Sequence, residues 1–163
     1  VGAGSTTAGS TASACPPDPG AREAHGGGSC CQIIWVDQRA FKEDFAGLRA
    51  ELEAATRLPA KSHKSAEKCL RLLQKKRRAR ERAQPGLLSV FLLSWANAPA
   101  VARYLAEEAP HLAAEIVVLC DMHGHRVRES AARWAEQYGP LVAKIAHTWT
   151  EATLAAASLA GAA

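Results

Sequence analysis

A nearly continuous apolar run occupies residues 87–93, Leu-Leu-Ser-Val-Phe-Leu-Leu, and a second occupies residues 115–120, Glu-Ile-Val-Val-Leu-Cys. Short runs of this kind are typical of parallel strands that helices cover on both faces. Each run leads into a stretch whose apolar residues recur at helical spacing. We therefore expect both runs to be central strands of a parallel sheet.

Three weaker blocks repeat the alternation of strand and helix, and their strands are expected at Gln32–Val36, Ala60–His63 and Leu141–Ala146. Five such units joined by right-handed crossovers predict an α/β fold. The expected architecture is a three-layer α/β/α sandwich with a five-stranded parallel sheet, most plausibly in the flavodoxin-like order 2-1-3-4-5. Ligands of such sheets bind beyond the carboxyl ends of the strands. Site residues should therefore follow the strands directly.

The stretches between the strands carry apolar stripes that predict helices. The first helix should end before Pro59, and its stripe is Phe41, Phe45, Leu48, Leu52 and Ala55. Ser65 is expected to cap the second helix, whose buried stripe is Ala66, Cys69, Leu70 and Leu73. Two later stripes are Val101, Leu105 and Leu112, with Pro99 in the first turn, and then Val127, Ala131, Trp134 and Tyr138. An Ala-rich last helix should begin at about Thr150.

The composition of the 163-residue chain fits one globular domain. Residues 1–29 are rich in Gly, Ser, Thr, Ala and Pro, which predicts a disordered low-complexity tail or linker before a domain at residues 30–163. No apolar run approaches the roughly 20 residues of a membrane span. Five cysteines at irregular spacings suggest no disulfide framework. We therefore expect a soluble protein of an intracellular, reducing compartment.

Three segments together resemble the receiver domain of two-component response regulators. They are Ile33-Ile34-Trp35-Val36-Asp37, residues 65–73, and the turn Leu92-Leu93-Ser94-Trp95-Ala96-Asn97-Ala98-Pro99. The likeness spans about residues 30 to 160. It implies an acidic pair after the first strand, a phosphorylatable aspartate after the third, Thr or Ser after the fourth and Lys after the fifth.

Most of those family positions hold other residues in this chain. Asp37 matches the first acid, but Gln38 stands at the second. The acceptor position falls on Trp95, with Ser94 beside it. Cys120 stands at the hydroxyl position, and His147, or less closely Lys144, stands at the position of the lysine. The resemblance therefore implies a degenerate receiver site in which only Asp37 is intact.

Phosphoryl transfer to a carboxylate needs an aspartate nucleophile, a divalent cation held by oxygen ligands and a fixed positive charge. One carboxylate, a glutamine and an indole do not assemble that site. The resemblance thus implies a non-catalytic pseudo-receiver: a protein-interaction or signalling module that is not phosphorylated on aspartate and holds no metal or cofactor. Its expected partner is a protein, or a second copy in a homodimer, at the fourth helix, fifth strand and fifth helix. Trp95 and Trp149 are expected to fill the space of the acyl phosphate and metal.

Two other functions, a small enzyme and a structural subunit, remain open from the residues alone. A small enzyme could use Cys120 and His147 as a nucleophilic pair, with Asp37 or Asp121 orienting the histidine. In the loop at residues 120–125, Cys120, His123 and His125 could hold zinc, but no second cluster supplies a further ligand. The chain could also be a structural subunit of a larger assembly.

Six basic residues at the end of the second predicted helix supply much of the net charge of +4: Lys75, Lys76, Arg77, Arg78, Arg80 and Arg82. A solvated helix end is the simplest interpretation, and an acidic partner surface is the alternative. Nucleic acid is disfavoured because no aromatic residue is interleaved with the basic ones.

Overall fold

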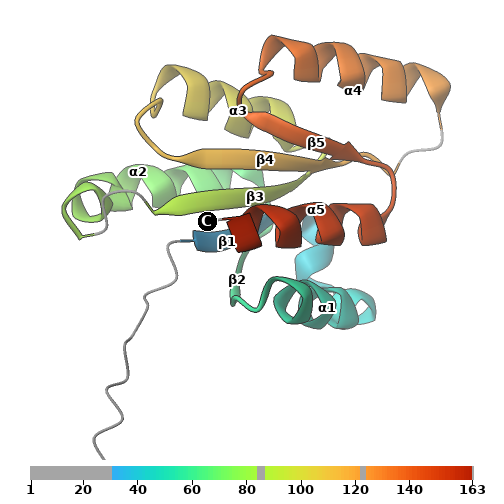
Figure 1. Cartoon of the computed structure of the whole chain (residues 1–163), viewed down its shortest axis with the longest axis horizontal. Helices are drawn as coiled ribbons and strands as arrows, with labels where there is room; N and C mark the ends of the chain where they lie inside the picture. The colour runs from blue at the N-terminus through green and yellow to red at the C-terminus, as the bar shows by residue number, and fades with distance from the viewer. Residues whose placement is uncertain (1–30, 84–86, 122–123, 163) are drawn as a thin grey trace, which may run out of the picture.

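A computed structural model describes residues 31–83, 87–121 and 124–162, apart from the side chains of residues 76–83 and 162. Its five strands form one parallel sheet in the order β2-β1-β3-β4-β5, as predicted (Figure 1). The strands are β1 (Cys31–Val36), β2 (Ala60–His63), β3 (Leu88–Ser94), β4 (Ala114–Leu119) and β5 (Val142–Ala146). This is a flavodoxin-like α/β fold.

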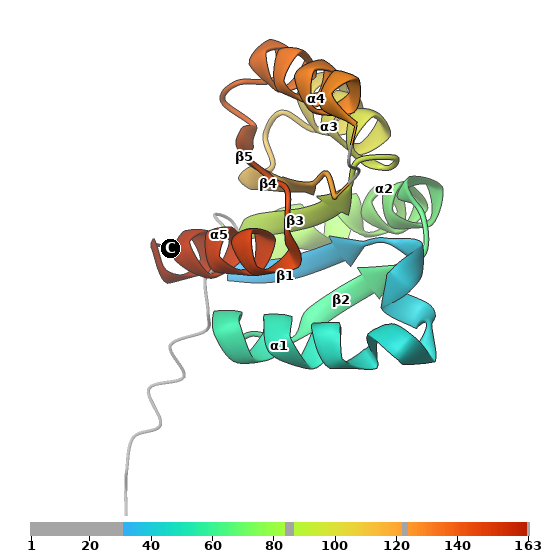
Figure 2. The same cartoon turned by 90° about the vertical axis from the view of Figure 1, so that its right-hand side faces the viewer.

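The helices form a layer on each face of the sheet. They are α1 (Ala46–Thr56), α2 (Ala66–Ala83), α3 (Ala98–Glu107), α4 (His125–Gln137) and α5 (Trp149–Ala162). Helices α1 and α5 lie on one face, and α2, α3 and α4 lie on the other (Figure 2). Because side chains alternate along a strand, Trp35 of β1 packs toward α1 and α5, whereas Ile34 and Val36 pack toward α2 and α3. This two-sided burial explains the continuous apolar runs of β3 and β4.

The segment after β1 differs from its prediction. The chain forms two 3₁₀ turns, Gln38–Phe41 and Glu43–Phe45, before α1 begins. Asp37 accepts a hydrogen bond from the backbone N–H of Arg39 and so caps the first turn. Phe41 lies in the first of these turns, before the helix, and is 49% exposed. Ala55 lies on α1 but is also exposed, so the predicted helical stripe is wrong at both residues.

The end of α3 is the second correction. The helix ends at Glu107, and Leu112 lies in the following loop instead of on the helical stripe with Val101 and Leu105. Pro110 explains the early end, because the residue before a proline is disfavoured in the α conformation and proline has no N–H to donate. Leu112 is thus left half-buried at the amino end of β4.

The remaining helices follow the sequence pattern. Ala66, Cys69 and Leu73 are buried along α2. Ser65 caps this helix, since its Oγ accepts a hydrogen bond from the backbone N–H of Lys68 at 3.4 Å. Pro99 lies in the first turn of α3. No helix among the described residues has both the length and the apolar character of a membrane span. The predicted tail at residues 1–29 lies outside the described residues.

Candidate functional site

The candidate site comprises residues at the carboxyl ends of β1, β3 and β4: Asp37, Ser94, Trp95, Cys120 and Asp121. We call this group of residues the strand-end crevice, after the place at which ligands of parallel α/β sheets usually bind. The registers Val36 with Leu93 and Ser94 with Leu119 bring these ends to one edge of the sheet. Asp37 is only 4% exposed, and its N–H donates to the carbonyl of His63 at 3.0 Å. The backbone therefore fixes the position of this carboxylate.

Arg39 connects two carboxylates across the crevice. Its Nε and Nη2 donate to Oδ2 of Asp37 at 2.9 and 2.6 Å, and its Nη1 donates to Oδ2 of Asp121. We call this arrangement the Arg39 bridge. Because β3 lies between β1 and β4 in the sheet, the bridge joins loops on either side of β3. Hydrogen bonds between ionised groups, as here, are stronger than those between neutral groups.

The electrostatics of the bridge favour a permanently charged guanidinium. The hydrogen bonds that the guanidinium donates to Asp37 raise the pKa of Arg39 above its usual value, against the opposing effect of desolvation. Asp37 and Asp121 contribute two negative charges and Arg39 one positive charge, so the net charge of the bridge is −1. A cation that entered the crevice would have to compete with a guanidinium that already contacts both acids.

Arg39 and Asp121 were missing from the predicted degenerate site. Among the receiver positions only Asp37 was expected to be acidic, and the structure adds Asp121, which joins Asp37 through Arg39. The sequence did contain two signals: Asp121 directly follows a buried strand, and Arg39 comes two residues after a capping aspartate. Neither signal shows that the two acids share one partner, because that contact spans 82 residues.

Ser94 and Gln38 lie near the bridge but take different environments. Ser94 Oγ accepts a hydrogen bond from Nδ2 of Asn97 at 2.8 Å. Oδ1 of the same Asn97 accepts from the backbone N–H of Ala66 at 2.9 Å, so the β3–α3 turn also satisfies a donor at the start of α2. Gln38 is exposed. Ser94 therefore helps to hold the crevice together.

The two tryptophans predicted to fill the crevice pack on opposite faces of the sheet. Trp95 is half-buried and meets Trp134 of α4 edge to face, with ring centroids 5.3 Å apart. Trp149 instead packs against Trp35 in a tilted arrangement, with ring centroids 5.1 Å apart, and its Nε1 donates to Oε2 of Glu51 in α1 at 3.0 Å. The side chain that lies between Asp37 and Asp121 and contacts both is therefore Arg39, and not a tryptophan.

Cys120 and His147 come together, but through the main chain. Nδ1 of His147 lies 3.2 Å from the carbonyl oxygen of Cys120. A carbonyl only accepts, so in this contact His147 donates from Nδ1. Cys120 is fully buried, so a substrate could reach its thiol only if the strand ends opened. This geometry gives the nucleophilic alternative no positive support.

A capping box holds His147 at the start of α5. Glu151 accepts from the N–H of His147 at 2.7 Å, and the N–H of Glu151 donates to Oγ1 of Thr148 at 3.2 Å. The hydrogen bond from His147 is the main cause of a lowered pKa at Glu151. Lys144, the other candidate for the lysine position, is exposed on β5.

Within the described part of the chain, no group of three or more His, Cys, Asp or Glu side chains is arranged to hold a metal ion. His125 is exposed at the start of α4, with Nδ1 3.4 Å from Glu129, and His123, the other histidine considered as a zinc ligand, lies outside the described residues. Lys75 of the predicted basic segment is exposed. The side chains of its other members, Lys76, Arg77, Arg78, Arg80 and Arg82, also lie outside the description.

The fold and the crevice define a flavodoxin-like α/β protein whose strand ends are joined by an internal ion bridge. Comparison of the chain with protein-family models, with curated proteins and with solved structures gave no match.

Proposed function

We propose that this chain is a non-catalytic, receiver-like module that binds a protein partner and is not phosphorylated on aspartate. The Arg39 bridge is the observation that carries the proposal. It supplies a fixed cation in the crevice and engages both oxygens of Asp37, one through the N–H of Arg39 and the other through its guanidinium. A receiver-type reaction would need those oxygens for a divalent cation.

The acceptor position supports the same proposal. An indole offers no carboxylate to phosphorylate, and Trp95 is packed against Trp134. The nearest hydroxyl, on Ser94, accepts a hydrogen bond from Asn97. The residues at the degenerate site therefore serve packing and hydrogen bonding.

The proposed partner surface comprises α4, β5 and α5. Strand β5 is an edge of the sheet, and its Ala143 and Lys144 are exposed. Helix α5 carries one charged residue, Glu151, and presents Leu154 with 64% of its surface exposed. Helices with so few charges are usually covered by other protein. A homodimer is one form that this contact could take.

We further propose an intracellular, reducing compartment. The five cysteines have irregular spacings that suggest no disulfide framework, and Cys31, Cys69 and Cys120 are buried. Burial raises the pKa of Cys31, which disfavours its reactive thiolate.

Phosphoryl analogues test the first part of the proposal. The full chain is incubated with acetyl phosphate and Mg²⁺, or with beryllofluoride and Mg²⁺, and its intact mass and Tm are measured. We expect no adduct and no change in Tm. Stoichiometric modification, or a clear rise in Tm, would contradict the proposal.

Removing the internal cation sharpens that test. Arg39→Ala leaves Asp37 and Asp121 without their shared partner, so we expect Mg²⁺ to raise the Tm of this variant but not of the wild type. Arg71→Ala is the matched control, because Arg71 is exposed and pairs with Glu67 one turn away in α2. Equal Mg²⁺ responses in all three proteins would show that Arg39 does not take the place of a cation.

The partner surface is tested separately. Native affinity purification is carried out with the wild type, with Leu154→Glu and with Ala50→Glu, which adds the same charge at an exposed position of α1. A partner, or a second copy of the chain, should be lost from Leu154→Glu and retained by Ala50→Glu. If no specific partner is recovered and the chain stays monomeric, the interaction proposal fails.

A further inference from the structure

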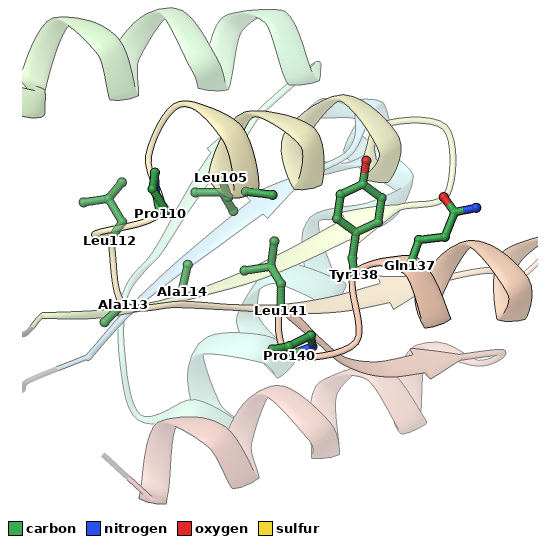
Figure 3. Close-up of a pocket in the computed structure, with 10 residues that line it drawn as sticks. Leu105, Pro110, Leu112, Ala113, Ala114, Gln137, Tyr138, Pro140 and Leu141 are labelled. Carbon is green, nitrogen blue, oxygen red and sulfur yellow. The ribbon is translucent and has the colours of Figure 1, made fainter.

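A pocket of about 420 Å³ lies at the opposite end of the sheet from the strand-end crevice. We call it the α3–α4 pocket, since it opens between the ends of these helices and the amino ends of β4 and β5 (Figure 3). Its size falls in the range of small-molecule sites, which is about 300–1,000 Å³. Its lining comprises Leu105, Ala106, Pro110, Leu112, Ala113, Ala114, Gln137, Tyr138, Pro140 and Leu141.

The lining is mainly apolar, with polar groups on Gln137 and Tyr138, and none of the described residues that form it is charged. Leu105, Leu112 and Leu141 gather on one side of the Tyr138 ring, and Gln137 lies on the other side (Figure 3). An ion placed against this surface would lose hydration without gaining a charged partner, which is costly. An uncharged, largely apolar molecule would instead remove hydrocarbon surface from water.

Hydrogen bonds hold both rims of the pocket in place. On one rim, the carbonyl of Tyr138 accepts from the N–H groups of Leu141 at 2.7 Å and Val142 at 3.0 Å. On the other, the N–H of Leu112 donates to the carbonyl of Ala109 at 3.0 Å. A preformed site avoids much of the entropy cost of ordering on binding.

Tyr138 provides a rigid wall with a polar tip. Its ring packs on Trp134, with centroids 5.3 Å apart, and Trp134 in turn contacts Trp95. The Tyr138 hydroxyl can donate or accept one hydrogen bond. A ligand that combines a ring or branched hydrocarbon with one hydroxyl or carbonyl group therefore matches this lining.

We infer that the α3–α4 pocket is a binding site for a small, uncharged, mainly apolar molecule with one hydrogen-bonding group. This inference goes beyond the proposed module function: the pocket borders the α4–β5–α5 surface at Gln137, but its test measures binding of a small molecule and needs no protein partner.

Three probes of similar size test the chemistry of the site: 4-methylphenol, toluene and benzoate. Each is titrated into isotope-labelled full chain and followed by NMR of methyl and amide groups. We expect saturable shifts at Leu105, Leu112 and Leu141 with 4-methylphenol and toluene, and at least about tenfold weaker binding of benzoate because its charge finds no partner. Benzoate binding as tightly as the neutral probes would overturn the inference.

Two variants locate the probe. Ala106 is exposed on α3 and lines the pocket, so Ala106→Phe should fill the site and abolish the shifts, whereas Ala132→Phe at an exposed position of α4 outside the lining should not. Tyr138→Phe should weaken 4-methylphenol about fivefold, the effect of one net hydrogen bond, and leave toluene unchanged. Spectra without probe confirm that each variant is folded. Absence of saturable shifts, shifts elsewhere, or unchanged binding to Ala106→Phe would each overturn the inference.

Discussion

The two ends of the sheet use their side chains in opposite ways. At the carboxyl end, Asp37, Arg39 and Asp121 satisfy one another's charges. At the amino end, Leu112, Leu141 and their neighbours leave a pocket of about 420 Å³. Parallel α/β sheets usually bind ligands at the carboxyl end. In this chain Arg39 pairs with both acids at that end, and the α3–α4 pocket lies at the other end.

An aromatic row extends between the two regions. Trp95 follows β3 at the crevice, Trp134 lies in α4, and Tyr138 lines the pocket; each neighbouring pair of rings has centroids 5.3 Å apart. The row belongs to the packing on the α2–α3–α4 face of the sheet. Binding at the pocket should therefore be visible in the fluorescence of Trp134.

The largest effect is expected from Asp37→Ala. The substitution removes acceptors for three N–H groups of Arg39, and the Arg39 side chain is 22% exposed, so its charge regains only part of its hydration. We expect a loss of about 2–3 kcal/mol in the free energy of unfolding. Urea denaturation followed by tryptophan fluorescence measures it. Asp44→Ala, at an exposed position, should cost less than about 0.5 kcal/mol.

If Asp37→Ala lost no more stability than Asp44→Ala, the crevice would not depend on its internal ion pair. The contrast between a charge-satisfied end and an open end of the sheet would then fail.

Asp121→Asn should have a smaller effect than Asp37→Ala. The Asp121 side chain is 44% exposed, so water can replace much of the hydrogen bonding and charge stabilisation that it receives from the guanidinium of Arg39. Exposed ion pairs contribute about 0–1 kcal/mol, and their contribution decreases as salt rises. Urea denaturation at low and high salt should show a cost below about 1 kcal/mol that shrinks with salt. A cost equal to that of Asp37→Ala would mean that the bridge acts as one indivisible unit.

Ala106→Leu probes the amino end by adding hydrocarbon. Leu and Ala have similar helix propensities, and position 106 lines the pocket, so the added side chain can cover Leu105 or Leu141 without displacing a buried group. We expect a gain of about 0.5 kcal/mol in the free energy of unfolding. Ala132→Leu, outside the pocket, should give no gain. A loss at position 106 would show that the pocket walls tolerate no added side chain.

The sheet order could be predicted because it depends on local patterns that agree along the chain. The runs of β3 and β4, the stripe of α2 and the breaker Pro59 each act within a few residues. The Arg39 bridge and the pocket depend on contacts between segments far apart, such as Arg39 with Asp121, and on where a helix stops. Leu112 illustrates this. Its apolar character predicted burial on the helix, but α3 ends at Glu107, before Pro110, and Leu112 lines the pocket from the following loop.

The smallest effect should come from the cap beneath His147, at the edge of the crevice. The pKa of Glu151 is lowered in the folded protein, so its stabilising contribution is full above the ordinary value of 4.5 and disappears as pH falls through the lower folded value. Glu151→Gln keeps an acceptor but removes this titration, so its Tm should fall less steeply below pH 4.5 than that of the wild type.

Glu53→Gln is the comparison at α1, because Glu53 accepts from the N–H of Ala60 and its pKa is also lowered. Thermal unfolding measured across the acid range should show a separate, shallower dependence for each variant. Parallel curves for Glu151→Gln and the wild type would place the acid sensitivity in other carboxylates.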